Sequence, residues 1–130
     1  MSQKILLIEN DNVFRWRLLH FLEEHNYQIL EAEDGTVGLK LARIHHPNLV
    51  LSEINLPCLN GYDVFKQFQK YKATASIPFI FLTNRDESEY MSALKVGATD
   101  CLSKALPFNQ VLERLLPHLK SVRFTDSFTK

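Results

Sequence analysis

The chain has 130 residues, 45% of them hydrophobic, which is enough for one globular domain with its own core. Basic and acidic residues number 15 each, so the formal net charge is zero and neither nucleic acid nor an anionic membrane is expected to bind the domain as a whole. No signal peptide or long apolar run is present and only two cysteines occur, Cys58 and Cys101, so we expect a cytoplasmic protein without a structural disulfide or a zinc site.

Five short apolar runs predict the strands of a sheet. The third run, Leu49-Val50-Leu51, is unbroken, which is typical of a central strand that is buried on both faces of a parallel sheet. Pro57 and Asn60-Gly61 end this stretch and precede a helix. The other runs are residues 4–8, 27–32, 77–83 and 101–102.

Between the strands, apolar residues recur at helical spacing. Phe14, Leu18, Phe21 and Leu22 form one face of a first helix that ends at Asn26, a residue able to adopt the left-handed conformation. Asp11 is suited to cap the start of this helix. The remaining helices are marked by Val37, Leu41 and Ile44 with Gly38 between them, by Val64, Phe65 and Phe68, by residues 86–96, and by Val111, Leu112, Leu115 and Leu116.

Alternating strands and helices predict a doubly wound α/β domain with a five-stranded parallel sheet. We assign residues 1–120 to this domain and residues 121–130 to a C-terminal tail or linker. Polar residues at the strand ends should converge on one edge, where α/β proteins bind their ligands. A carboxylate directly after a buried strand needs a partner, and Lys104 is the natural one for Glu53. The converging residues are Glu9, Asn10, Glu53, Thr83 and Lys104.

Four motifs in one order resemble the receiver domain of bacterial two-component response regulators, over about residues 3–119. The first strand is followed by acidic residues, the third strand ends in a carboxylate and a proline loop, the fourth ends in threonine, and the fifth is preceded by Gly-Ala and followed by lysine. They are residues 5–11, 48–61, 80–84 and 97–104. The resemblance implies a chemotaxis-protein-like fold with strand order 2-1-3-4-5.

The resemblance also implies roles for individual residues. Glu53 occupies the phosphoacceptor position, and Thr83 and Lys104 occupy the positions that grip the phosphoryl group. The family's magnesium positions correspond to Glu9, Asn10, Glu53 and the carbonyl of Asn55.

Several residues depart from the family pattern. Glu53 is one methylene longer than the usual aspartate and Asn10 lacks a charge, so we expect weak magnesium binding and no cofactor. Ala105 replaces the usual proline, which favours a trans bond after Lys104. Cys101 replaces the aromatic switch residue.

The preferred interpretation is an atypical, non-enzymatic receiver that works by protein docking without phosphorylation. The alternatives are a working phosphoacceptor that uses Glu53 or Ser52 and, from another class, a flavodoxin-like flavin carrier, which the acidic loop after the first strand disfavours. Expected partners are a histidine kinase or another pathway protein and an output domain, but no nucleic acid or membrane. We expect a monomer or a weak homodimer, with Asp100 and Arg114 at positions that pair across dimers in related receivers. Trp16, Leu19 and Arg15 on the first helix are predicted to form a partner surface.

Overall fold

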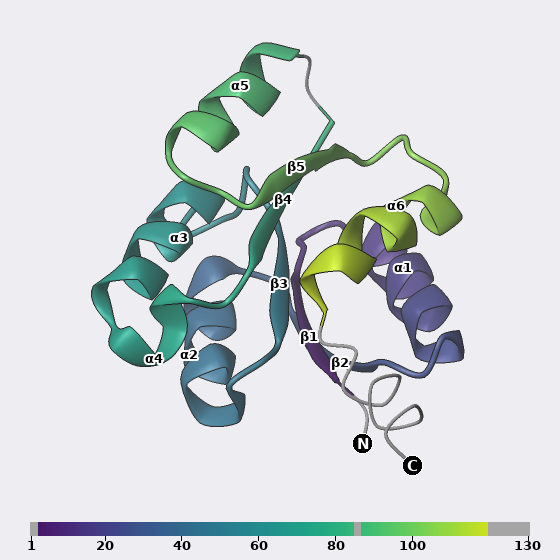
Figure 1. The fold of residues 1–130 in the computed structure, drawn as a ribbon, viewed down its shortest axis with the longest axis horizontal. Helices are drawn as coiled ribbons and strands as arrows, with labels where there is room; N and C mark the ends of the chain where they lie inside the picture. Colours follow the sequence, from purple (N-terminus) through teal and green to yellow (C-terminus); the bar gives the residue numbers. More distant parts are fainter. Residues whose placement is uncertain (1–2, 85–86, 120–130) are drawn as a thin grey trace.

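The computed structural model describes residues 3–84 and 87–119, which form a parallel sheet covered on both faces by helices (Figure 1). The strand order β2-β1-β3-β4-β5 is the predicted one. Among the described residues, no helix is both long enough and apolar enough to cross a membrane. The strands are β1 (Lys4–Ile8), β2 (Gln28–Ala32), β3 (Leu49–Glu53), β4 (Phe79–Thr83) and β5 (Asp100–Ser103).

The helices lie in two layers. Figure 1 shows α1 and α6 on one side of the sheet and α2, α3 and α4 side by side on the other. Helix α5 lies next to β4 and β5, and its Ala93 belongs to the core that α2 and α3 cover. The helices are α1 (Asn12–Glu24), α2 (Gly35–His45), α3 (Gly61–Lys70), α4 (Lys72–Ala75), α5 (Glu87–Lys95) and α6 (Phe108–Leu115), followed by the short 3-10 helix η1 (Leu116–His118).

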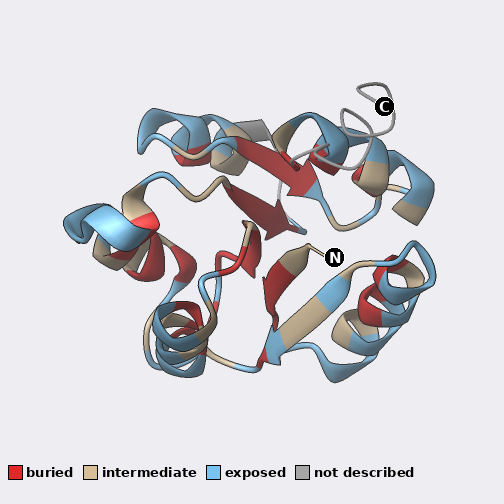
Figure 2. Ribbon diagram, turned by 60° about the horizontal axis from the view of Figure 1, so that its bottom comes forward, coloured by how far each residue is buried: buried red, intermediate tan, exposed pale blue. Residues whose placement is uncertain are grey.

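Each face of the sheet has its own hydrophobic core, because successive side chains of a strand point to opposite faces. On β1, Ile5 and Leu7 pack with buried leucines of α1 and α6, whereas Leu6 and Ile8 pack toward α2 and α3. Burial on both sides explains the unbroken apolar runs in the sequence. The central strands are accordingly buried along their length (Figure 2).

The ends of α1 agree with the sequence prediction. The Asp11 carboxylate accepts hydrogen bonds from the backbone amides of Val13 and Phe14, each 3.0 Å long, and therefore caps the helix. After the helix ends, Asn26 adopts a left-handed φ of 71°.

The exposed side of α2 differs from the prediction. Val37 and Ile44 are exposed, while Gly35, Gly38 and Ala42 face the core. A Cβ atom on Gly38 would lie 2.4 Å from Ile8 Cδ1, so the glycine allows α2 to approach the sheet closely. Leu41, the third residue of the predicted face, is half-buried and packs against this core together with Leu39, so small residues and leucines together orient the helix.

Other boundaries also differ. Strands β2 and β4 begin one and two residues later than expected, α4 was not predicted, and α6 ends at Leu115. Leu116 is 48% exposed at the start of η1, where Pro117 interrupts the helix, and does not belong to the buried stripe. Residues 85–86, within or next to the start of the predicted fourth helix, and the predicted tail at 121–130 lie outside the described residues.

Candidate functional site

The carboxyl edge of the sheet brings Glu9, Glu53 and Lys104 into direct contact. Glu9 follows β1, Glu53 ends the neighbouring β3, and Lys104 follows β5. The Lys104 Nζ atom lies 2.9 Å from Glu9 Oε1 and 3.0 Å from Glu53 Oε1. All three side chains are buried: Lys104 is 6% exposed, Glu9 is 0% exposed and Glu53 is 7% exposed. The predicted Glu53–Lys104 ion pair is confirmed, and the second carboxylate makes it a buried triad.

Backbone amides bind the remaining carboxylate oxygens. Glu53 Oε2 accepts hydrogen bonds from the amides of Ile54 at 2.8 Å and Asn55 at 3.1 Å. Glu9 Oε2 accepts one from the amide of Asp11 at 3.0 Å. Lys104 donates a hydrogen bond to Glu53, whereas its contact with Glu9 Oε1 is an ion pair without hydrogen-bond geometry. Both oxygens of Glu53 are therefore occupied by donors of the chain itself.

Burial and the opposite charges of the partners act against each other on the ionisation of Glu9 and Lys104. Burial raises the pKa of Glu9 above its usual value, although the Asp11 amide and the Lys104 ammonium act in the opposite direction. Burial also lowers the pKa of Lys104, but Glu9 and Glu53 outweigh this effect and leave the pKa raised. Lys104 therefore contributes stability below its unfolded-state pKa, and this contribution is lost as the pH rises through the folded-state value.

The residues present do not fit a magnesium ion. Magnesium requires near-octahedral oxygen coordination and favours carboxylates, but Oε1 of Glu9 and Oε1 of Glu53 both lie against the Lys104 ammonium. Asn10 and Asn55 are exposed. Within residues 3–84 and 87–119, no three His, Cys, Asp or Glu side chains are grouped so as to hold a metal. The chain's own cation lies where the two carboxylates converge.

Thr83 lies at the same edge but its hydroxyl binds elsewhere. Its side chain is buried and donates a hydrogen bond to Glu89 Oε1 of α5. The backbone amide of Lys104 donates to the Thr83 carbonyl at 2.8 Å, which joins the ends of β4 and β5. Glu89 could not be predicted as part of this edge, because no sequence pattern indicates which way the first turns of α5 face.

Cys101 occupies a buried position beside this edge. It is 3% exposed, and burial, followed by the charge of Glu89, raises the pKa of its thiol to about 11. The thiol is therefore neutral at ordinary pH and poorly reactive.

Among the described residues every peptide bond is trans, so the bond between Lys104 and Ala105 agrees with the prediction.

Only part of the predicted α1 surface is exposed. Trp16 is 63% exposed, and its ring centroid lies 4.3 Å from that of His20 one turn along the helix. Leu19, in contrast, is 8% exposed and packs in the core that α1 shares with α6. Its predicted exposure is wrong, because the buried side of α1 extends beyond the residues that the apolar spacing marks and includes Leu19 as well as Leu18 and Leu22. Trp16 therefore remains the exposed member of the predicted surface.

Arg15 is also directed away from a free surface. Its side chain is 12% exposed and pairs with Glu31 at 3.0 Å. It also donates hydrogen bonds to the Glu9 carbonyl at 2.6 Å and to Asn12 Oδ1 at 2.8 Å. Arg15 thus holds the loop that carries Glu9, and its predicted role as part of an exposed partner surface needs correction.

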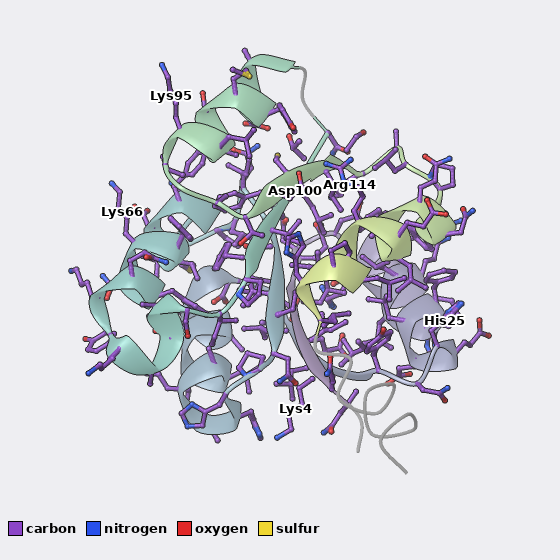
Figure 3. The ribbon with its side chains drawn as sticks, in the orientation of Figure 1. Lys4, His25, Lys66, Lys95, Asp100 and Arg114 are labelled. Carbon is purple, nitrogen blue, oxygen red and sulfur yellow. The ribbon has the colours of Figure 1, made fainter. Side chains whose placement is uncertain are left out.

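Asp100 and Arg114 pair within the chain. Arg114 donates from Nε and Nη2 to the two oxygens of Asp100, at 3.0 Å and 2.7 Å, and Figure 3 shows both side chains between β5 and α6. The charges expected at a dimer interface therefore satisfy each other in one molecule.

Comparison with known proteins identifies the family. The model of the response regulator receiver domain matches residues 5–116. The chain is 34% identical to protein PilH of Pseudomonas aeruginosa, over 86% of this chain and 93% of PilH. It is 31% identical to the transcriptional regulatory protein PhoP of Bacillus subtilis, over 88% of this chain but only 48% of that protein.

Structural similarity agrees with the sequence match. The chemotaxis protein CheY4 of Vibrio cholerae superposes with a TM-score of 0.84 at 23% identity, over 92% of this chain and all of CheY4, and so shares the fold. The segment that the family model matches, residues 5–116, contains Glu9, Glu53 and Lys104 and all of the sheet except Lys4. This chain belongs to the response regulator receiver domains, the signal-receiving domains of two-component systems.

Proposed function

We propose that this receiver domain functions without phosphorylation of Glu53 and transmits its signal by docking to other proteins of its pathway. The observation that supports the proposal is the position of the Lys104 ammonium, 2.9 Å and 3.0 Å from the carboxylates of Glu9 and Glu53. A positive charge is already held at the edge where phosphoryl chemistry would need a metal ion.

The state of Glu53 itself supports the proposal. An attacking carboxylate oxygen has to be available and correctly placed, but one oxygen binds Lys104 and the other binds two backbone amides. The additional methylene of glutamate displaces the oxygen by about 1 Å relative to aspartate, and a displacement of that size can cost about a hundredfold in rate. Thr83, the other expected phosphoryl ligand, donates its hydroxyl to Glu89.

The alternative phosphoacceptor has little support. Ser52 is fully buried in β3, and its hydroxyl donates a hydrogen bond to the Glu53 carbonyl at 2.9 Å. A phosphodonor would not reach this hydroxyl without opening the sheet. The flavin-carrier alternative is also disfavoured, because the Glu9 and Asp11 carboxylates after β1 would repel a flavin phosphate.

The proposed partners are proteins. A histidine kinase or another component of the same pathway would bind the folded domain, with exposed Trp16 on α1 as one contact. An output domain is a further proposed partner, because PhoP is about twice as long as the segment that matches this chain. We propose that the domain acts as a monomer or weak homodimer in the cytoplasm, without catalysing a reaction of its own.

Treatment with a small phosphodonor and magnesium, followed by measurement of the intact mass, tests this function. The native chain should gain no phosphoryl group, whereas the double variant Asn10→Asp, Glu53→Asp should gain one, because it restores a metal charge and a shorter nucleophile together. Each single change should give a weaker gain than the pair. Phosphorylation of the native chain as readily as of the double variant would refute the proposal.

A further inference from the structure

The charges of this chain are unevenly distributed. Residues 35–75 contain five basic and two acidic residues, whereas the rest of the chain contains 10 basic and 13 acidic ones. A neutral total therefore conceals a segment of net charge +3 and a remainder of −3. This segment comprises α2, β3, α3 and α4.

The five basic residues of the segment are all exposed, and we call them the basic face. Figure 1 shows α2, α3 and α4 side by side on one side of the sheet, and Figure 3 shows the Lys66 side chain extending outward from α3. Neither acidic residue of the segment forms an ion pair with them in the described structure, because Glu53 is paired with Lys104 in the buried triad and Asp63 has no ion-pair partner there. The basic face consists of Lys40, Arg43, Lys66, Lys70 and Lys72.

Favourable interaction with the helix dipoles explains the positions of only some residues of the basic face. Arg43 and Lys70 lie in the last turns of α2 and α3, where cations interact favourably with the helix dipole. Lys40 and Lys66 lie in the middle of these helices and have no such role. Within the described part of the chain, none of the five makes an ion pair, whereas Arg15, Lys104 and Arg114 all do.

Apolar side chains are exposed among these cations. Ile44 is 58% exposed and Tyr71 is 48% exposed. The Arg43 guanidinium carbon lies 5.0 Å from the centroid of the Tyr71 ring, so the end of α2 and the turn between α3 and α4 form one continuous surface. Tyrosine and arginine beside an exposed aliphatic residue are typical of protein-binding surfaces, whereas a purely solvated charged face has no use for Ile44 and Tyr71.

We propose that the basic face binds an acidic segment of a partner protein, whose carboxylates pair with the cations while an apolar side chain packs on Ile44 and Tyr71. Charge complementarity selects an acidic partner, and the apolar contact selects a protein. A nucleic acid is disfavoured because the rest of the chain carries a net charge of −3 that would repel a long polyanion. The inference rests on the proposed docking function and adds a surface separate from Trp16.

A fluorescently labelled short peptide of alternating glutamate and leucine provides the probe, and its binding is followed by fluorescence anisotropy. The native domain should bind it, and Arg43→Glu and Lys72→Glu should each weaken binding by about tenfold. Ile44→Ser should weaken it by about threefold without changing the charge. Lys95→Glu is the matched control, because Lys95 is an exposed cation on α5, outside the basic face, and this change should alter binding by less than about twofold.

Several outcomes would overturn the proposal. The first is that the native domain does not bind the peptide. The second and third are that Lys95→Glu weakens binding as much as Arg43→Glu and Lys72→Glu do, or that Ile44→Ser has no effect. The others are that the domain binds oligothymidylate more tightly than the peptide, or that sedimentation attributes the anisotropy signal to self-association of the peptide alone. Circular dichroism confirms that each variant is folded. Because this assay contains neither phosphodonor nor magnesium, its failure leaves the phosphorylation test unaffected, and the two proposals can fail separately.

Discussion

Replacing Lys104 with methionine should destabilise the domain more than any other single change at the sheet edge. The attraction between unit charges about 3 Å apart is about 5 kcal/mol at an effective dielectric constant of 20, and most of it offsets the cost of burying the charges. Removing one partner of a buried ion pair typically costs about 3–5 kcal/mol. Here Glu9 and Glu53, 0% and 7% exposed, would both lose their cation, so we expect a loss at the upper end.

The companion variants separate the contributions of the triad. Glu53→Gln should cost only about 1–2 kcal/mol, because Lys104 keeps its contact with Glu9. Lys104→Met combined with Glu53→Gln should cost about 1–3 kcal/mol less than the sum of the two single losses, because the second change removes a carboxylate that the first leaves unpaired. Adding Glu9→Gln should restore further stability.

Urea unfolding followed by the fluorescence of Trp16, the only tryptophan, measures these free energies. Arg114→Met is a comparison variant, because its side chain is 47% exposed and Asp100, which is 12% exposed, keeps the hydrogen bond from the Cys101 amide; this change should cost about 1–2 kcal/mol, less than Lys104→Met. Strictly additive losses for Lys104→Met and Glu53→Gln would show that the residues are not coupled and would refute the reasoning.

Three further changes test other parts of the structure. Trp16→Ala should weaken binding of the pathway partner, measured by calorimetry, by at least about tenfold while unfolding changes little; unchanged affinity would exclude this contact. The pKa of the Cys101 thiol is raised to about 11, so the thiol ionises in the unfolded chain before it ionises in the folded one. The free energy of unfolding, measured with urea, should therefore fall by at most about 2.7 kcal/mol as the pH rises from 9 to 11, and Cys101→Ala should remove this contribution to the fall. Gly35→Ala should cost about 1–3 kcal/mol in the same assay, because its Cβ would lie 2.0 Å from the Leu59 carbonyl oxygen; a loss no larger than that of exposed Thr36→Ala would contradict the packing.

The fold could be predicted because its determinants are local. Buried parallel strands require unbroken apolar runs, and polar residues directly after those runs must meet at one edge of the sheet. This is why the contact between Glu53 and Lys104 could be predicted although 51 positions separate them.

The features that the sequence did not reveal depend on tertiary packing. Leu19 lies outside the simple helical stripe but is buried in the core between α1, the sheet and α6. Ile44 is exposed because Gly38 and Ala42 bring the opposite side of α2 against the sheet. The bond from Thr83 to Glu89 depends on the orientation of α5, which no local pattern specifies. Glu9 was expected at the site, but no sequence pattern indicates that the Lys104 ammonium contacts Glu9 as well as Glu53.

A magnesium titration of the native domain, followed through the backbone amide signals of Glu9, Glu53 and Asn55 by nuclear magnetic resonance, tests the central claim most directly. With the Lys104 ammonium between the two carboxylates, these signals should not move at magnesium concentrations that shift them in the Asn10→Asp, Glu53→Asp variant. Saturable shifts of the same signals in the native domain, at the same concentrations as in the variant, would show that Lys104 does not exclude the metal and would contradict the account of a receiver that works without phosphorylation.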